Sequence, residues 1–167
     1  KIIPYRGSWV EFEFDNKNLL YVRIDRKRKF YGTVFLRALG IKNDSDVLKA
    51  FYKISELNLK DKRIFWKIDE SLIGVKLGSA IMTKGGDVVH PANRKIKEST
   101  IDACRKARID QVEVTTAEIE GAWVAADVID METGEVLAEA NQELTSSALA
   151  KLMEAGIRKV EVFFPDR

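Results

Sequence analysis

The feature that most limits the folds open to this chain is an internal repeat at an offset of 48 residues. Residues 86–114 align without gaps to residues 134–162, and ten of the 29 aligned positions are identical. Each copy shows two strand-like segments around a Gly-bearing turn, then helical apolar spacing, then a closing segment that ends in Val-Glu-Val. We therefore predict the unit ββαβ twice, at about residues 75–114 and 123–162. Two copies are too few for a solenoid, so one compact α+β body is expected.

The helical part of each copy predicts which side chains it buries. Ile101 and Cys104 in the first copy align with Leu149 and Leu152 in the second, and a spacing of three residues places each pair on one helix face. Cys104, the single cysteine, is therefore interpreted as a small core hydrophobe rather than as a nucleophile. One cysteine excludes an internal disulfide and a cysteine-based zinc site, and we expect a reducing, cytoplasmic compartment.

Other residues with possible chemistry are interpreted as structural. His90 aligns with Ala138 and has no Cys, Asp or Glu cluster at ligand spacing, so we predict a turn residue before Pro91 rather than a base or a metal ligand. Acidic pairs at a spacing of two residues suit acid/base catalysis on a strand, but they are equally typical of an exposed strand face (Glu11 with Glu13, Glu118 with Glu120). We expect no catalytic residue, no cofactor and no metal in this chain.

The sequence before the repeat has a different pattern. Residues 9–25 alternate bulky and polar side chains around a polar turn at 15–18, which predicts a β-hairpin. Apolar spacing then predicts one short helix at about residues 33–39 and a second that is capped by Asp44 or Ser45. Strand-like sequence returns after these helices as a second hairpin. We therefore place a domain boundary near residue 52, which divides the chain into residues 1–52 and 53–167.

Basic side chains gather in the N-terminal part. Residues 1–52 carry 11 basic and 6 acidic side chains, a net charge of +5, whereas the remainder carries 17 and 20, a net charge of −3. The densest run is Arg23-Ile24-Asp25-Arg26-Lys27-Arg28-Lys29, at the end of a hairpin whose other strand begins with Trp9. Cationic groups pair with phosphates and a tryptophan face stacks on an unpaired base, so the pattern suits single-stranded or melted nucleic acid. On composition alone, a solvated basic turn is an equal alternative.

Four segments of this part form a longer, ordered pattern. They are Ile-Pro-Tyr-Arg-Gly-Ser-Trp at 3–9, Glu-Phe-Glu-Phe-Asp at 11–15, Val-Arg-Ile-Asp-Arg-Lys-Arg-Lys at 22–29 and Leu-Arg-Ala-Leu-Gly at 36–40. Together they resemble the lobe domain of the β subunit of bacterial RNA polymerase. Phe30-Tyr31-Gly32 departs from that family, where Leu-Pro and a small residue are usual. Residues 53–167 resemble, more loosely, the lineage-specific insertion that interrupts this lobe in many bacteria.

The resemblance implies a non-catalytic piece of a nucleotidyltransferase that carries out DNA-directed RNA synthesis, with the catalytic magnesium on another subunit. In the family, the lobe is a wall of the DNA channel, and the tryptophan that matches Trp9 lies at the non-template strand. The implied partners are the other polymerase subunits (α, β′, ω and σ), promoter and downstream DNA, and secondary-channel regulators of the DksA type at the insertion. The expected location is the cytoplasm, associated with the nucleoid. The expected DNA-binding residues are Arg6, Trp9, Arg23, Asp25, Arg26, Lys27, Arg28 and Lys29.

Two other classes of function compete with this interpretation. A stand-alone nucleic-acid-binding module would use the same basic hairpin at residues 9–29, but the sequence begins with Lys1, so we expect a piece of a longer protein. An enzyme built on the repeat would need polar residues that converge in both copies, whereas the shared positions are mostly apolar or turn-forming. No apolar run approaches the ~18 to 20 residues that a membrane-spanning helix needs, so no membrane association is expected.

Overall fold

A computed structural model describes residues 1–166 of the chain. It divides into two compact units, Lys1–Ala50 and Phe51–Arg167, which we call unit 1 and unit 2. The division lies close to the boundary near residue 52 that was expected from the sequence. The two units are described separately below.

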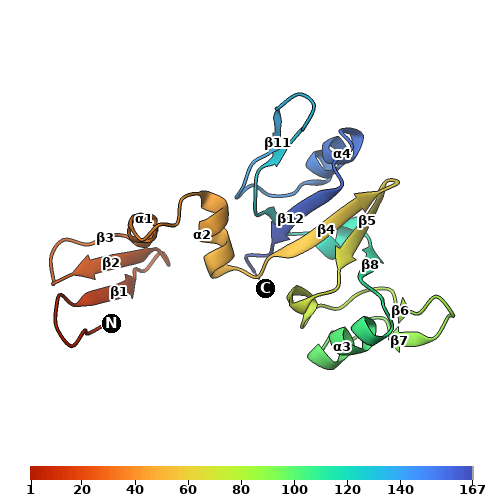
Figure 1. The fold of residues 1–167 in the computed structure, drawn as a ribbon, viewed down its shortest axis with the longest axis horizontal. Helices are drawn as coiled ribbons and strands as arrows, with labels where there is room; N and C mark the ends of the chain where they lie inside the picture. The colour runs from red at the N-terminus through yellow and green to blue at the C-terminus, as the bar shows by residue number, and fades with distance from the viewer. Residues whose placement is uncertain (167) are drawn as a thin grey trace. The chain divides into compact units, whose positions relative to one another are not determined.

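Unit 1 is built on a three-stranded antiparallel sheet in the order β1-β2-β3 (Figure 1). The predicted hairpin is confirmed, because β1 and β2 pair as its two strands. Asp15 holds the turn between them: its carboxylate accepts hydrogen bonds from the N–H groups of Lys17 and Leu19 at 2.8 and 2.9 Å. Asn18 takes a left-handed φ of 60°, which Asn tolerates better than most residues. The strands are β1 (Val10–Phe14), β2 (Leu20–Ile24) and β3 (Phe30–Tyr31).

Two short helices follow the sheet, as the apolar spacing predicts: α1 (Gly32–Ala38) and α2 (Asp44–Phe51). The predicted cap of α2 was wrong by one residue, because the side chain of Asn43, rather than Asp44 or Ser45, accepts the N–H of Asp46 at 2.8 Å. Asn, Asp and Ser side chains can all cap a helix, so the backbone path decides which of these neighbouring residues does so. Unit 1 buries only Val22 and Leu48 among its large apolar side chains.

Unit 2 is organised around a five-stranded antiparallel sheet in the order β8-β5-β4-β12-β9. The central pair is the second predicted hairpin, and its turn residues Asp61 and Lys62 have left-handed φ values of 51° and 59°. Such a pair of positive φ values suits a tight two-residue hairpin turn. The strands are β4 (Ser55–Lys60), β5 (Arg63–Lys67), β8 (Gln111–Val114), β9 (Trp123–Val124) and β12 (Lys159–Phe163).

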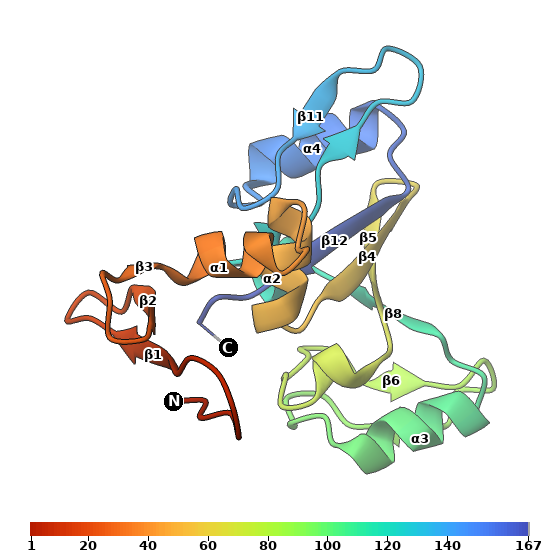
Figure 2. The ribbon, with the colours of Figure 1, turned by 60° about the vertical axis from the view of Figure 1, so that its left-hand side comes forward.

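The predicted duplication is confirmed, since each copy folds as ββαβ. The first comprises β6 (Ile81–Met82), β7 (Val88–His90), α3 (Glu98–Lys106) and β8, and the second comprises β10 (Val128–Ile129), β11 (Val136–Ala138), α4 (Ser146–Glu154) and β12. Short 3-10 helices precede the copies at η1 (Glu70–Leu72) and η2 (Thr116–Ile119). The helices of the copies lie toward opposite edges of the sheet (Figures 1 and 2), because β8 pairs with β5 and β12 pairs with β4. The central hairpin therefore separates the copies.

Several identities between the copies have a backbone cause. Asn93 and Asn141 both take a left-handed φ, 58° and 66°. Each donates its N–H at 2.7 Å to a carbonyl of the segment before the hairpin, Asn93 to Leu77 and Asn141 to Val124. Asn is among the few residues that occupy this conformation readily. These matching bonds also make Leu77 and Val124 structurally equivalent.

The predicted helix faces are buried in one continuous core. Ile101, Cys104, Leu149 and Leu152 are at most 4% exposed. Burial raises the pKa of the Cys104 thiol, which keeps it protonated and unreactive. The core interpretation of the cysteine and of its three partners is confirmed.

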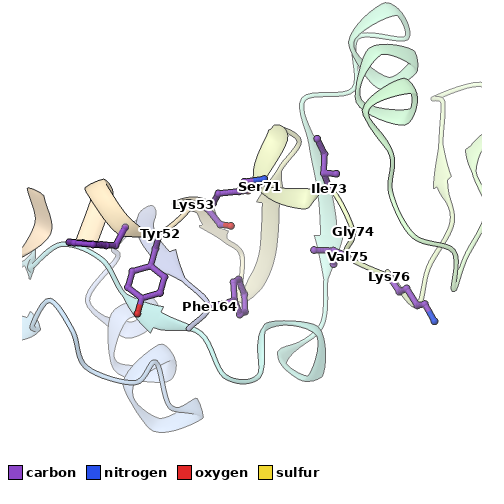
Figure 3. A pocket seen from close by; sticks show the side chains of 10 residues that line it. Tyr52, Lys53, Ser71, Ile73, Gly74, Val75, Lys76 and Phe164 are labelled. Carbon is purple, nitrogen blue, oxygen red and sulfur yellow. The ribbon is translucent and has the colours of Figure 1, made fainter. Parts of the chain in front are cut away.

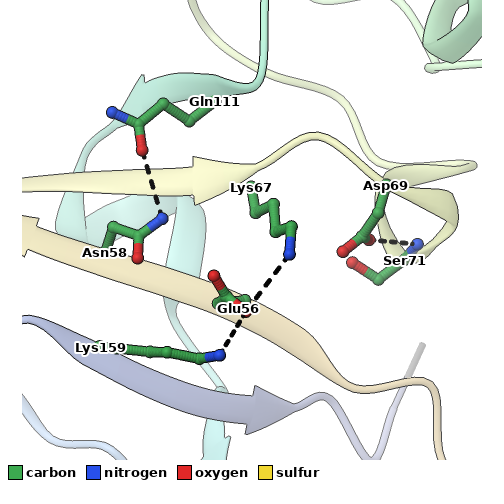
Figure 4. Close-up of polar contacts among 7 residues, drawn as sticks. All are labelled: Glu56, Asn58, Lys67, Asp69, Ser71, Gln111 and Lys159. Carbon is green, nitrogen blue, oxygen red and sulfur yellow. Dashed lines mark hydrogen bonds and ion pairs between the residues drawn. The ribbon is translucent and has the colours of Figure 1, made fainter. Parts of the chain in front are cut away.

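Polar side chains cross the exposed face of the central sheet and join its strands (Figure 4). Glu56 on β4 lies 2.7 Å from the Lys159 amine on β12 and 3.5 Å from the Lys67 amine on β5. The hydrogen bond from Lys159 is the main reason that the pKa of Glu56 lies below its ordinary value. Asn58 donates to the side-chain carbonyl of Gln111 at 3.2 Å, across the intervening strand.

The interpretation of His90 was wrong. His90 is 8% exposed and ends strand β7 instead of occupying a turn. Its Nε2 lies 3.1 Å from the Arg94 carbonyl and its Nδ1 lies 3.4 Å from the Thr100 hydroxyl, so both ring nitrogens have a structural partner. None of the helices among residues 1–166 has the length and the apolar character to cross a bilayer.

Candidate nucleic-acid interface

The basic run of unit 1 is folded into a tight turn at the end of the β1–β2 hairpin. Asp25 and Arg26 have left-handed φ values of 54° and 58°, and the Lys27 N–H donates to the Ile24 carbonyl at 3.0 Å. Two positive φ values in succession define the two-residue turn that matches the twist of a hairpin. The run is therefore divided between Arg23 on β2 and the cations of the turn that follows it.

Trp9 is brought directly against this turn. Its carbonyl accepts the Asp25 N–H at 2.9 Å, and the hydroxyl of Ser8 donates to the Asp25 carboxylate at 3.1 Å. Two cations lie over the indole ring, the Lys1 amine at 4.1 Å and the Arg26 guanidinium at 5.6 Å from the ring centroid. Cation–π attraction of this kind is worth ~0.5 to 1 kcal/mol at exposed sites. Trp9 remains 36% exposed, so part of its ring is open to a ligand.

Some cations of the run are engaged by carboxylates. Arg23 and Lys29 both approach the Glu13 carboxylate, at 3.6 and 3.2 Å, and the Lys29 amine lies 4.4 Å from the centroid of the Tyr21 ring. On the same strand as Glu13, Glu11 accepts a hydrogen bond from Lys1 at 2.8 Å, which is the main cause of its lowered pKa. These pairs hold the side chains in place and reduce the local positive charge.

Three of the expected DNA-binding cations have no such partner. The side chains of Arg6, Lys27 and Arg28 are exposed and make no ion pair or hydrogen bond with any side chain among residues 1–166. Lys27 and Arg28 belong to the turn beside Trp9, whereas Arg6 precedes Trp9 and no contact places it at the indole. Asp25 serves the turn geometry through Ser8 and Trp9. We call Trp9 and the cations of the adjoining turn, Arg26, Lys27 and Arg28, the basic turn surface.

Sequence reasoning missed the role of Lys1 and the neutralising role of Glu13. The role of Glu13 could have been predicted from the sequence. The polar turn at residues 15–18 fixes a register in which Glu11 faces Arg23 and Glu13 faces Tyr21. Charged residues on facing strands then become neighbours. The position of Lys1 over Trp9 depends on the path of the first residues, which run back along β1 through an isolated bridge between Ile2 and Val10. No local pattern indicates that path.

Unit 2 holds a separate pocket of about 660 Å³, with aromatic, apolar and basic walls (Figure 3). Tyr52 and Phe164 supply rings, while Lys53 and Lys76 supply cations. None of the DNA-binding residues expected from the sequence lines it. Among residues 1–166 there is also no group of three or more His, Cys, Asp or Glu side chains that could hold a metal ion.

Comparison with known proteins links both units to one family. Residues 1–76 match the family described as RNA polymerase Rpb2, domain 2. Over its whole length the chain is 59% identical to a segment of DNA-directed RNA polymerase subunit beta of Solibacter usitatus. It is also 53% identical to the corresponding protein of Koribacter versatilis, and over 99% of its length it is 38% identical to that of Sorangium cellulosum. The chain belongs to the bacterial RNA polymerase β-subunit family.

The matches also show how the chain relates to the polymerase β subunits. It spans about 12% of the length of each of these relatives. The alignments continue through both ββαβ copies, so unit 1 and unit 2 occur together in the β subunits of these bacteria. The Rpb2 domain match extends past unit 1 into β4 and β5 and ends at Lys76, before the first ββαβ copy.

Proposed function

We propose that this chain is a non-catalytic part of a β subunit in DNA-directed RNA polymerase, and that its basic turn surface borders the DNA at the non-template strand. The observation that carries the proposal is the position of Trp9, which is partly open, lies near two cations, and packs against the turn that leads into Lys27 and Arg28. An aromatic face next to unpaired cations suits a strand whose bases are unstacked and whose phosphates lie alongside. In this proposal the cations attract the backbone and the indole receives a base.

The exposed apolar side chains of unit 1 support a place within a larger assembly. Tyr5, Phe14 and Leu39 are each at least 68% exposed, although a stable domain normally buries side chains of this size. In the proposal the rest of the β subunit covers them. The partners of the assembled enzyme are then the α, β′, ω and σ subunits together with promoter and downstream DNA, and the enzyme works in the cytoplasm, associated with the nucleoid. The catalytic magnesium lies on another subunit.

For unit 2 we propose a docking role for regulators of the polymerase, of the secondary-channel DksA type. The observation that supports it is structural independence: unit 2 has its own five-stranded sheet and a continuous core. A body of this kind keeps its shape while its surface serves binding. Because unit 2 carries none of the basic turn surface, the DNA role and the docking role can be tested separately.

The DNA role is tested in the assembled polymerase by comparing three variants across a salt series. Arg28→Ala should weaken open-complex affinity on every promoter sequence and reduce the slope of log affinity against log salt by ~0.7 to 0.9, as expected for one lost phosphate contact. Trp9→Ala should cost ~1 to 3 kcal/mol and leave the slope nearly unchanged, because stacking releases no counterion. Lys17→Ala removes a cation at the opposite end of the same hairpin and is the matched control. Open complexes of Trp9→Ala that are as stable as wild type on every promoter would refute the stacking role.

A further inference from the structure

The two ββαβ copies differ at the outer edges of their closing strands. In the second copy, the outer edge of β12 is covered by β9, with Val162 opposite Val124 and Phe163 opposite Trp123. The next bond of this ladder runs from the Ala125 N–H to the Glu161 carbonyl at 2.8 Å. The second copy therefore shows how a short antiparallel segment closes this kind of edge.

In the first copy, a carboxylate takes the N–H of the residue that is equivalent to Ala125, and no strand among residues 1–166 covers the outer edge of β8. Leu77 is equivalent to Val124, so Gly78 stands where Ala125 stands in the second copy. The Gly78 N–H donates to Glu118 Oε1 at 2.7 Å, and the other oxygen of Glu118 accepts the Thr115 N–H at 2.7 Å. Glu118 therefore holds the Gly78 segment beside Thr115 and away from the rest of β8. The edge of β8 is left uncovered from Gln111 to Val114.

The register of the sheet shows which backbone groups point out of this edge. The Ile68 N–H donates to the Asp110 carbonyl, and in an antiparallel pair the bonded residues alternate. Val112 and Val114 therefore bond to β5, while the N–H and C=O groups of Gln111 and Glu113 point outward. No backbone hydrogen bond to these outward groups is found within residues 1–166.

A groove of about 530 Å³ runs along this edge. One wall is formed by residues 109–115 and the other by residues 79–83. The lining combines apolar side chains with Ser, Thr and Gln side chains, and Glu113 is its one charged residue among those of the described chain. Glu113 is exposed, and its ion pair with Arg63 is 3.6 Å long, so its charge remains open to a further partner.

We propose that this groove binds an extended segment of a partner protein, which adds to the sheet as an antiparallel strand beside β8. The segment has the chemistry of residues 122–126 around β9, apolar side chains that are mostly small, with a cationic side chain opposite Glu113. Pairing with Gln111 and Glu113 supplies the main-chain hydrogen bonds, and the groove walls select the side chains. A second copy of β8 does not fit as well, since it would bring its own wall of residues 79–83 and a second Glu113 carboxylate. The inference rests on the geometry of this edge and goes beyond the proposed DNA contact.

The test uses the full 167-residue chain and a fluorescent peptide with the sequence of residues 120–127, which contains β9, with Ala125→Lys to supply the cation opposite Glu113. On binding, the amides of Gln111 and Glu113 should gain protection from hydrogen exchange by about tenfold or more. Glu113→Pro should weaken binding by at least about tenfold, because it removes an outward N–H. It leaves the β5 ladder intact, and proline is tolerated on edge strands at such positions. The matched control Glu113→Thr keeps the N–H and should bind within about threefold of wild type.

Two further arms complete the test. A peptide with Ala125→Lys should bind about threefold or more tighter than one with Ala125→Glu, because that position faces Glu113. If circular dichroism shows that Glu113→Pro is unfolded, Gln111→Pro takes its place, since its N–H also points outward. The proposal is overturned if the wild-type chain fails to bind the peptide, if the proline variant binds it as well as the threonine variant does, or if protection appears on β12 instead. Concentration-dependent dimers that the proline variant abolishes would assign the edge to a second copy and overturn the partner assignment.

Discussion

Leu152→Ala tests whether the duplicated helix face anchors unit 2. Leu152 is fully buried on α4, and its counterpart in the first copy, Cys104, is equally buried. The substitution removes three carbon atoms, which at ~0.8 kcal/mol each gives ~2.4 kcal/mol for transfer to water. The cavity that remains adds to this, and buried Leu→Ala changes cost ~2 to 5 kcal/mol in total. We expect a loss of about 3 to 4 kcal/mol in the free energy of unfolding of unit 2.

The measurement is urea unfolding followed by tryptophan fluorescence, because Trp66 is fully buried in the same core. With a urea dependence of ~2 kcal/mol per M, the midpoint should fall by about 1.5 to 2 M. Cys104→Ala removes a single sulfur atom and should cost on the order of 1 kcal/mol. Lys151→Ala, on the exposed side of α4, should change stability by under about 0.5 kcal/mol. A Leu152→Ala midpoint that matches the Lys151→Ala midpoint would refute the assignment of this helix face.

Two further predictions concern single contacts. Burial acts to raise the pKa of Glu118, but hydrogen bonds from the Thr115 and Gly78 N–H groups and the Thr115 hydroxyl outweigh it, so the pKa lies below the ordinary 4.5. The carboxylate therefore stabilises the fold above pH 4.5, and this contribution is lost as the pH falls toward the lowered pKa. Glu118→Gln should lower the free energy of unfolding by ~1.5 to 3 kcal/mol at pH 7. Unfolding curves should show that the difference in this free energy between variant and wild type shrinks below pH 4.5. A difference that stays constant with pH would contradict the prediction. Gly32→Ala should destabilise unit 1 by ~1 to 3 kcal/mol, because a Cβ there would lie 2.7 Å from Leu20 Cγ. The stability of unit 1 can be measured from hydrogen exchange of the β2 amides. If Gly32→Ala destabilises unit 1 equally in wild type and in Leu20→Ala, the clash with Leu20 is not the cause.

The fold of unit 2 was largely predictable because its duplication shows which positions are constrained. Identical glycines and asparagines mark left-handed turns, and matched apolar residues mark the buried helix faces. The arrangement of the copies around the β4–β5 hairpin was not predictable, since strand order depends on pairings between segments far apart in the chain. The burial of His90 was not predictable for a related reason: its ring lies against the Arg94 carbonyl and the Thr100 hydroxyl, and both contacts depend on the path of the chain from β7 to α3.

The candidate site was predictable in composition and not in geometry. Charge density and Trp9 indicate the surface, but the sequence does not say that Arg23 and Lys29 share Glu13 while Lys27 and Arg28 stay open. That difference arises from the positive φ values at Asp25 and Arg26, which turn the chain before Lys27. Backbone conformation therefore divides a run of similar cations into structural and available ones. The salt series with Arg28→Ala and Trp9→Ala tests whether one of these available cations contacts a phosphate.

The topology of unit 2 is compatible with insertion into another domain. Its first sheet strand, β4, and its last, β12, are antiparallel neighbours, and Ser55 at the start of β4 faces Val162 near the end of β12. Facing residues in such a pair lie only ~4.5 to 5.5 Å apart. A host domain can therefore accept unit 2 at a single loop without separating the two sides of that loop, and insertions with adjacent ends are well tolerated for this reason. The two copies then differ at their outer edges: β9 covers the edge of β12 in the second copy, whereas in the first copy Glu118 binds the Gly78 N–H and the edge of β8 stays uncovered.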